Sequence, residues 1–267
     1  MPLRVMTYNI KNGGEDRSGG ERLDDIIEVI RTAAPDVLAL QELRGFSASA
    51  RTPELAQAVG LRAFLAPSCF GQPVAVLVRP PGRVVAAGPV RRPFHHAAQR
   101  VTVQTSAGPL HVVGTHLHPY SGMRRLVEAG WLVSAYRRSA GGLALLMGDL
   151  NTLDPWTDHA AAVERLPPPY RGRHLRARSS AVDSRAISRL DRAGLVDLFR
   201  HAGRGEPQTA ATTQGGGAEF SGMRLDYVFG TPAVAARTRW CEVVRGGAAE
   251  RASDHYPVLA ELDLDLP

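Results

Sequence analysis

Short apolar runs recur along the whole chain, and most of them are too brief for a helix. Runs of about four to eight residues rich in valine, leucine and isoleucine are typical of buried β-strands. The pattern predicts strands at 3–8, 36–41, 73–79, 83–90, 99–105, 109–116, 143–148, 224–229, 239–245 and 256–263. The runs Val84–Pro89, Val101–Thr105 and Leu110–Thr115 follow one another closely enough to pair as antiparallel strands.

Helical periodicity appears at three places. The first is 21–33, where one face would be formed by Leu23, Ile26, Ile27 and Ile30. Pro35 would close this helix. The second is 122–138, with an apolar side formed by Met123, Leu126, Val127 and Trp131. A third helix fits about 184–193. Taken together, many strands with few helices predict an α/β layered sandwich.

Length and composition fit one soluble domain. The chain has 267 residues, of which 44% are hydrophobic and 22% charged, so we expect a single domain over 1–267. No apolar run approaches about 18 residues, so no membrane insertion is expected. No secretory signal is evident, which favours the cytoplasm. Cys69 and Cys241 form no disulfide or zinc pattern and are expected to be ordinary buried thiols. We expect the protein to be a monomer.

Positive charge is concentrated in one segment. The net charge of the chain is +6, and residues 165–192 hold eight arginines against two aspartates, so the remainder is neutral. This segment overlaps the largest irregular stretch, 152–183, and we expect a variable, arginine-rich insertion around 152–192. Such a patch can attract a phosphate-bearing partner such as a nucleic acid, or it can be a solvated surface without a partner.

Polar side chains stand where several apolar runs end. Others lie inside an apolar run or just before one. Together they offer amides, carboxylates and imidazoles: Asn9, Glu42, His116, Asp149 and Asn151 after a run, Asp226 inside one, and Asp254 and His255 near the start of the last. A carboxylate or imidazole beside an apolar layer needs a partner or a cation, because unpaired burial is costly. Oxygen ligands suit Mg²⁺, and phosphoryl chemistry needs a positioned water and donors for developing charge. The sequence contains no G-x-S-x-G motif and no Walker A loop.

The ordered motifs resemble those of the endonuclease/exonuclease/phosphatase superfamily, which has the DNase I-like fold. The resemblance is carried by Tyr8-Asn9, Gln41-Glu42, Gly114-Thr115-His116, Gly148-Asp149-Leu150-Asn151, Leu225-Asp226-Tyr227 and Ser253-Asp254-His255. It implies a four-layer α/β/β/α sandwich of two packed mixed β-sheets. It also implies a Mg²⁺-dependent phosphoesterase in which Mn²⁺ can substitute.

The resemblance further implies a role for each motif residue. Glu42 would be the main metal ligand, with Asn9 beside it and Asp254 as a further ligand. Asp149 would orient or deprotonate the attacking water. Asn151 would contact the phosphate or that water, and His116 would donate to the phosphate or assist the leaving group. His255 would bind the scissile phosphate oxygen, with Asp226 holding its ring. Taken singly, each residue could instead be a turn cap, a solvated charge or a satisfied core side chain.

Four further residues are candidates for substrate contact: Lys11, His118, Tyr120 and Arg124. Helix capping and surface solvation are equally good explanations for the last three. Trp156 and Tyr170 are candidate stacking platforms near the basic segment. His95-His96 has metal-binding residue types but no matching third ligand.

The substrate stays open between three hypotheses. The arginine-rich segment favours a nucleic-acid or nucleotide phosphodiester. The alternatives are a phosphomonoesterase for a small phosphorylated metabolite and a non-catalytic phosphate-binding module. The pair Thr115-His116 and the presence of Lys11 differ from the members of the superfamily that repair abasic DNA, which argues against that activity.

Overall fold

Two β-sheets pack face to face in the computed structural model, which describes residues 2–16, 19–47, 49–137 and 142–266. The first sheet has the strand order β10 (Gly203–Arg204), β12 (Thr238–Val243), β13 (Val258–Leu262), β1 (Leu3–Asn9), β2 (Val37–Gln41), β4 (Val74–Val78), β3 (Arg62–Ala66). The second has the order β5 (Val84–Pro89), β6 (Ala97–Thr105), β7 (Gly108–His116), β8 (Leu143–Asp149), β11 (Asp226–Gly230), β9 (Val196–Asp197). Both sheets are mixed, because β1 and β2, and likewise β7 and β8, run parallel within otherwise largely antiparallel sheets.

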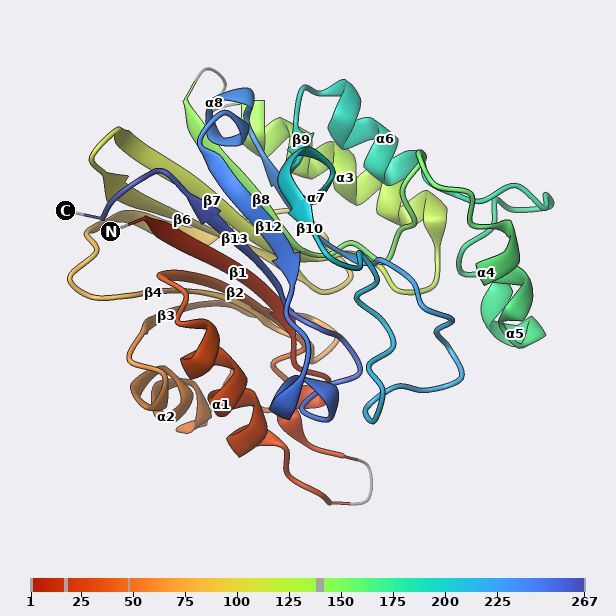
Figure 1. Cartoon of the computed structure of the whole chain (residues 1–267), viewed down its shortest axis with the longest axis horizontal. Helices are drawn as coiled ribbons and strands as arrows, with labels where there is room; N and C mark the ends of the chain where they lie inside the picture. The colour runs from red at the N-terminus through yellow and green to blue at the C-terminus, as the bar shows by residue number, and fades with distance from the viewer. Residues whose placement is uncertain (1, 17–18, 48, 138–141, 267) are drawn as a thin grey trace.

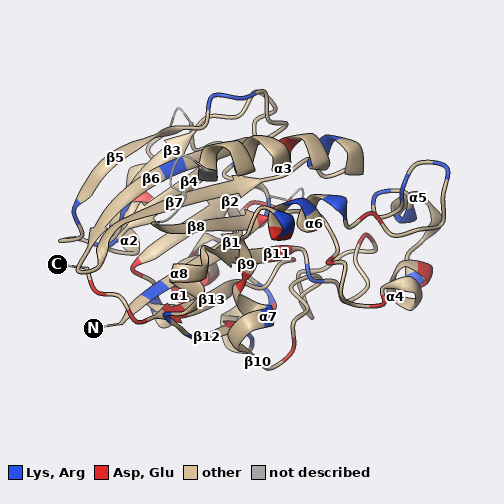
Figure 2. Ribbon diagram, turned by 90° about the horizontal axis from the view of Figure 1, so that it is seen from above, with Lys and Arg blue, Asp and Glu red and all other residues tan. Residues whose placement is uncertain are grey.

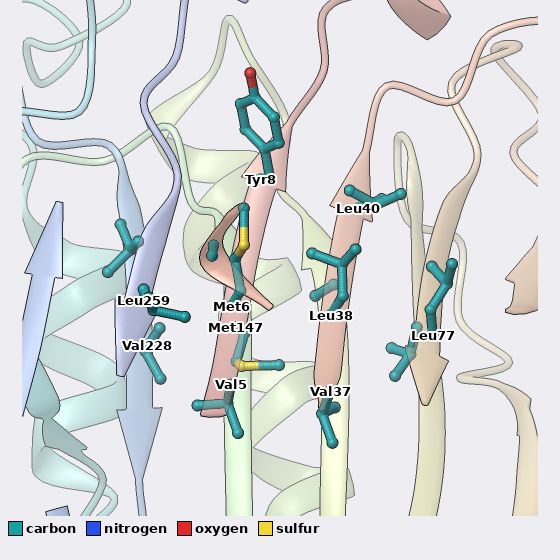
Figure 3. Close-up of a cluster of buried hydrophobic side chains, with 14 of the residues drawn as sticks. Val5, Met6, Tyr8, Val37, Leu38, Leu40, Leu77, Met147, Val228 and Leu259 are labelled. Atoms are coloured by element: carbon teal, nitrogen blue, oxygen red, sulfur yellow. The ribbon is translucent and has the colours of Figure 1, made fainter. Parts of the chain in front are cut away.

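The core lies between the two sheets. Met147 and Val228, from the second sheet, belong to the same buried cluster as Val5, Val37 and Leu38 of the first (Figure 3). Burial on both faces explains why these strands read as continuous apolar runs rather than alternating ones. Gly114 permits the close approach of the sheets, because a Cβ there would lie 2.8 Å from a methyl group of Val76.

Helices cover the outer faces of the sandwich (Figure 1). On one side lie α1 (Leu23–Ala33) and α2 (Arg51–Ala58), and on the other lie α3 (Gly122–Arg137) and α6 (Arg185–Arg192). Shorter helices are α4 (Ala160–Arg165), α5 (Pro168–Arg171), α7 (Leu198–Ala202) and α8 (Pro232–Ala235), with 3-10 turns η1 (Asn12–Gly14) and η2 (Gly247–Glu250). The four-layer sandwich expected from the sequence is confirmed. Among the described residues, no helix combines the length and apolar character needed to cross a membrane.

The expected elements are present, with errors in detail. All ten predicted strands and all three predicted helices exist, and the three hairpin strands pair antiparallel as β5, β6 and β7. The strand β3 and the helix α2 were not predicted, and the irregular stretch 152–183 contains α4 and α5. The expectation of a buried thiol is confirmed for Cys241 but wrong for Cys69, which is exposed in the loop between β3 and β4.

The predicted apolar side of α3 is wrong for Met123 and Val127 but right for Trp131, which packs against the buried cluster of the second sheet. Met123 and Val127 are exposed, whereas Arg125 and Glu128 are buried. The reason is tertiary: the first turns of α3 face loops whose backbone groups need charged partners. Arg125 Nη1 donates to the carbonyl oxygen of His118 at 3.2 Å, and Nη2 donates to that of Arg173 at 2.6 Å. Farther along, Ala129, Leu132 and Val133 pack on the second sheet.

The arginine-rich segment extends beyond one end of the sandwich. Figures 1 and 2 show α4 and α5 past the end of the sheets at which α3 begins. Basic residues colour α6 and the chain around α5 in Figure 2. The insertion around 152–192 packs against the chain that precedes β11 in a small separate core, which joins Leu153, Val163 and Leu166 to Ala210, Met223 and Leu225.

Candidate active site

Strand register brings the predicted polar residues to one edge of the sandwich. His116 and Asp149 are neighbours at the ends of the parallel strands β7 and β8, and Asp149 pairs across to Asp226 at the start of β11. In the first sheet, Asn9 ends β1 beside the end of β2. Gly148 precedes Asp149 with φ +153°, and an added Cβ would overlap the carbonyl oxygen of Thr115. The glycine of this motif is therefore required by the close approach of β8 to β7.

Asp149 is the buried centre of the site. Its Oδ2 accepts a hydrogen bond from Asn9 Nδ2 at 3.0 Å and lies 3.4 Å from His116 Nε2 and 3.9 Å from His255 Nε2. Its Oδ1 accepts from the backbone N–H of Asn151 at 2.8 Å. Burial alone would raise the pKa of Asp149, but the two imidazoles lower it below its ordinary value, so the carboxylate is ionised at neutral pH.

His255 is held by a second buried carboxylate. Its Nδ1 lies 2.7 Å from Asp226 Oδ2. Burial opposes a charged ring, but Asp226 and Asp149 together raise the pKa of His255 well above its ordinary value. Ligand atoms of Asp149, Asp226 and His255 lie within 4.8 Å of one another, a spacing that could also hold a cation. The short bond between His255 and Asp226 instead favours a hydrogen-bonded set that fixes the ring and its proton.

Glu42 lies on the other side of Asn9 and is partly exposed. Its Oε1 accepts from Asn9 Nδ2 at 3.2 Å, and its Oε2 accepts from the backbone N–H of Asn12 at 3.0 Å and from Gln72 Nε2 at 3.4 Å. The amide of Asn9 thus bridges the carboxylates of Glu42 and Asp149. Gln72 was not predicted; it follows no apolar run, so the sequence carries no signal for it.

Left-handed backbone is concentrated at this edge. Lys11 (φ 50°), Asn12 (φ 53°), Glu42 (φ 60°) and Asn151 (φ 47°) all adopt it. Such a conformation costs a non-glycine residue on the order of 1–3 kcal/mol and persists where the surroundings hold it. The strain therefore coincides with the two motifs that present Glu42 and Asn151.

The oxygen donors fit a hard divalent cation. Glu42 is a partly exposed carboxylate near the buried carboxylate of Asp149, and Mg²⁺ commonly uses one or two carboxylates and keeps several waters. Asn9 offers its amide nitrogen, not its oxygen, to both carboxylates, while its Oδ1 accepts from the Lys11 backbone at 3.0 Å. Asp254 Oδ2 lies 3.2 Å from Lys11 Nζ, so this carboxylate already has a cationic partner.

His116 and Asn151 form the remaining wall. Asn151 Nδ2 lies 3.0 Å from His116 Nε2 and donates to the carbonyl oxygen of Leu117 at 3.1 Å. Burial would lower the pKa of His116, but Asp149 raises it above its ordinary value. The ring of His96 stacks on that of His116 with centroids 4.0 Å apart, and neither of its buried ring nitrogens has a hydrogen-bond partner among the residues that the structure describes.

The predicted substrate contacts fall into two groups. Lys11 reaches the site, where Nζ donates to the carbonyl oxygen of Gly215 at 3.0 Å besides pairing with Asp254. His118 is buried, and its Nδ1 accepts from the backbone N–H groups of Tyr120 and Ser121, both at 3.1 Å, so it caps the start of α3. Tyr120 and Arg124 are exposed beside it.

Glu128 was missed by the sequence analysis although it holds two loops at the site. Its Oε1 accepts from the backbone N–H of His95 and its Oε2 from that of His118, both at 2.7 Å. Burial raises the pKa of Glu128. In the sequence it is indistinguishable from a solvated helical glutamate.

Comparison with known proteins agrees with this geometry. Residues 6–255 match a model of the endonuclease/exonuclease/phosphatase family. A search of curated proteins found no match. Among solved structures, the chain is similar to an endonuclease/exonuclease/phosphatase from Bacteroides vulgatus, with a TM-score of 0.72 and 16% identity over 100% of both chains.

Two solved structures of TDP2 are also similar. Truncated TDP2 from Caenorhabditis elegans gives a TM-score of 0.65 at 18% identity over 98% of this chain and 97% of that one. TDP2 from D. rerio, complexed with a single strand DNA product, gives 0.69 at 14% identity over 98% and 99%. At these identities the likeness shows a shared fold, and the DNase I-like architecture is confirmed.

The Glu128 contacts generate a stability prediction. In Glu128→Gln one carboxylate oxygen becomes an amide nitrogen, which leaves one backbone N–H without an acceptor. We expect the free energy of unfolding to fall by about 1–3 kcal/mol, measured by urea denaturation. Glu54→Gln, at an exposed position of α2, is the matched control and should change little. Equal stability of Glu128→Gln and the wild type would contradict the role of Glu128.

His174 generates a pH prediction. Burial, reinforced by Arg125 and Arg173, lowers the pKa of His174 to about 4. The unfolded chain binds this proton near pH 6.5, so the stability from the neutral buried ring is present above that pH and is lost as the pH falls toward about 4. We expect the wild type to lose up to about 3 kcal/mol of unfolding free energy from this group, a loss absent in His174→Gln.

The measurement is urea denaturation of both proteins between those pH values. The exposed His201 supplies the control, because His201→Gln should keep the wild-type slope. Identical slopes for the wild type and His174→Gln would refute the assignment.

Proposed function

The chain belongs to the endonuclease/exonuclease/phosphatase family, and on that premise we propose that it is a Mg²⁺-dependent phosphoesterase that hydrolyses a nucleic-acid or nucleotide phosphodiester. The observation that carries the proposal is the surroundings of Asp149. An ionised, buried carboxylate lies 3.4 Å from one imidazole and 3.9 Å from another, with the amide of Asn9 joining it to Glu42. These are the parts that activation of a water and stabilisation of a phosphoryl transition state require.

Glu42 is the proposed principal ligand of the metal, with Asn9 and Asp254 as further ligands. For Asn9 this requires its amide to rotate so that the oxygen, rather than the nitrogen, faces the ion beside Glu42. For Asp254 it requires release from the ion pair with Lys11. When bound, a divalent cation would neutralise phosphate charge and polarise the ester. Lys11 would then be free to contact a phosphate oxygen.

Asp149 orients the attacking water in this proposal. A carboxylate with a lowered pKa is a weak proton acceptor, so orientation is favoured over full deprotonation in the ground state. The water oxygen forms a bond to phosphorus and passes a proton to Asp149 in the transition state while the ester P–O bond breaks. His255, held protonated by Asp226 and Asp149, donates to a phosphate oxygen as negative charge develops.

The departing oxygen needs a proton, and His116 can supply it. Asp149 raises the pKa of His116, which favours the protonated ring that this step needs. Asn151, adjacent to His116, would contact the phosphate or the water. The arginine-rich insertion around 152–192 would add electrostatic attraction for a phosphate-bearing substrate.

The first test is Asp149→Asn. We expect the rate of phosphodiester hydrolysis in Mg²⁺ to fall by about 10²- to 10⁴-fold. The geometry also predicts some loss of stability, because Asp149 is buried between two imidazoles, so folding is checked by circular dichroism at the assay temperature. Asp24→Asn, exposed on α1, is the control. A wild-type rate in Asp149→Asn would refute the proposed role.

The second test is removal of the metal. We expect EDTA to abolish hydrolysis and Mg²⁺ or Mn²⁺ to restore it, and Glu42→Gln to raise the Mg²⁺ concentration required for half-maximal rate. Full activity in chelator would contradict the role of Glu42.

A third test is a panel of substrates assayed in Mg²⁺: duplex DNA, single strands, RNA, dinucleotides, sugar phosphates and inositol phosphates. Turnover of the monoesters alone would identify a phosphatase, and no turnover of any of them would favour a binding module.

A further inference from the structure

A row of aromatic rings passes beside the site and has both of its ends in solvent. We call Phe70, His95, His118 and Tyr120 the ring ledge. The centroids of Phe70 and His95 lie 4.4 Å apart with an interplanar angle of 20°, those of His95 and His118 lie 4.3 Å apart, and those of His118 and Tyr120 lie 6.0 Å apart. Three separate loops supply these four rings, so their continuity does not follow from local sequence.

Both ends of the ring ledge are exposed. Among the large apolar side chains exposed in the described part of the chain, the aromatic ones are Phe70, at 62%, and Tyr120, at 60%. A single exposed aromatic side chain needs no explanation. Here the two exposed rings belong to one connected row. Phe70 stacks on half-buried His95, whose ring is tilted by 44° to that of buried His118, and Tyr120 meets His118 edge to face at 82°. The rings open to a ligand are therefore those of Phe70 and Tyr120.

The ring ledge adjoins the proposed catalytic residues. The centroid of His95 lies 4.6 Å from that of His96, and the ring of His96 stacks on that of His116 at 4.0 Å. His116 in turn lies 3.4 Å from Asp149. The ledge is therefore close enough to His116 for one substrate molecule to place a base on the ledge and a phosphate at His116.

Arginines lie beside the Tyr120 end of the ring ledge. The guanidinium carbon of Arg173 lies 5.0 Å from the ring centroid of Tyr120 and 4.8 Å from that of Tyr170, so the arginine-rich segment extends the row. Arg124 is exposed on the first turn of α3. Alternating rings and guanidinium groups suit a ligand with flat faces joined by anionic links.

The ledge is held in place before any ligand binds. Glu128 fixes the backbone of both His95 and His118, and buried Arg125 fixes the carbonyl groups of His118 and Arg173. Little ordering is then needed on binding, which favours affinity.

We propose that the ring ledge stacks the nucleobases of an unpaired strand whose scissile phosphate lies at Asp149 and His116. This inference rests on the proposed function and narrows its substrate to single-stranded or frayed nucleic acid. Bases inside a duplex already stack on each other and present only their edges, whereas unpaired bases offer faces to aromatic side chains.

The test compares two strands that differ only in their bases. One is a short oligonucleotide, and the other has the same length and phosphates with abasic spacers. Binding is measured by fluorescence anisotropy in EDTA, where hydrolysis cannot interfere, and kcat and KM are measured in Mg²⁺. DNA and RNA strands form parallel arms, and base dependence in either arm supports the ledge. A blunt duplex should bind with the same affinity to the wild type and to variants of the ring ledge.

We expect the wild type to prefer the base-bearing strand. Phe70→Ala and Tyr120→Ala should each weaken affinity for that strand by roughly 5- to 100-fold, the range expected for loss of one base stack. The loss should appear in KM more than in kcat. Tyr120→Phe should retain the preference, and Val85→Ala, an exposed apolar control at 46% on β5, should match the wild type.

Equal binding of the two strands by the wild type, or equal loss of both in the alanine variants, would overturn the ledge. Binding of a blunt duplex as tight as that of the single strand would also overturn it. Hydrolysis without base preference would leave the proposed function standing and remove the ledge. Base-dependent binding in EDTA without any hydrolysis in Mg²⁺ would support the ledge and refute the proposed function.

Discussion

A buried negative charge at Asp149 is the constraint on which the site depends. The carboxylate is shielded from water, and an isolated charge in that position would be prohibitively costly. The fold answers with hydrogen-bond donors and imidazoles from several strands and loops, including Asn9 from β1, His116 from β7 and His255 ahead of β13. Each of these side chains has a further polar partner of its own, so the hydrogen-bond network around one carboxylate includes residues from both sheets.

The backbone is shaped to meet that demand. Gly148 lets β8 approach β7 closely enough for Asp149 to lie beside His116. The left-handed conformations of Glu42 and Asn151 turn those side chains back toward the same point once their strands have ended. A strained backbone is affordable there because the large, rigid core between the sheets holds the strand ends in place (Figure 3).

The sequence predicted what depends on strands and failed where tertiary contacts decide. Most motif residues stand at or near strand ends, and because period and punctuation locate a strand end, their meeting at one edge of the sandwich could be expected from the sequence, whereas their proposed roles rest on the family resemblance. The inner face of α3 could not, because the burial of Arg125 and Glu128 depends on carbonyl and N–H groups of distant loops. The strand β3 escaped because it is an edge strand whose residues are mostly half-buried. The capping role of His118, in contrast, was one of the two alternatives that the sequence left open.

The anchor of the arginine-rich segment has an evolutionary consequence. Arg125 holds the arginine-rich segment by donating a hydrogen bond to the backbone carbonyl oxygen of Arg173, a group that every residue type possesses. Its attachment there is therefore indifferent to which side chain stands at that position. Side chains on this segment can change under selection for a different ligand while the main chain keeps its path, which makes the segment a natural place for new specificities to arise on an unchanged fold.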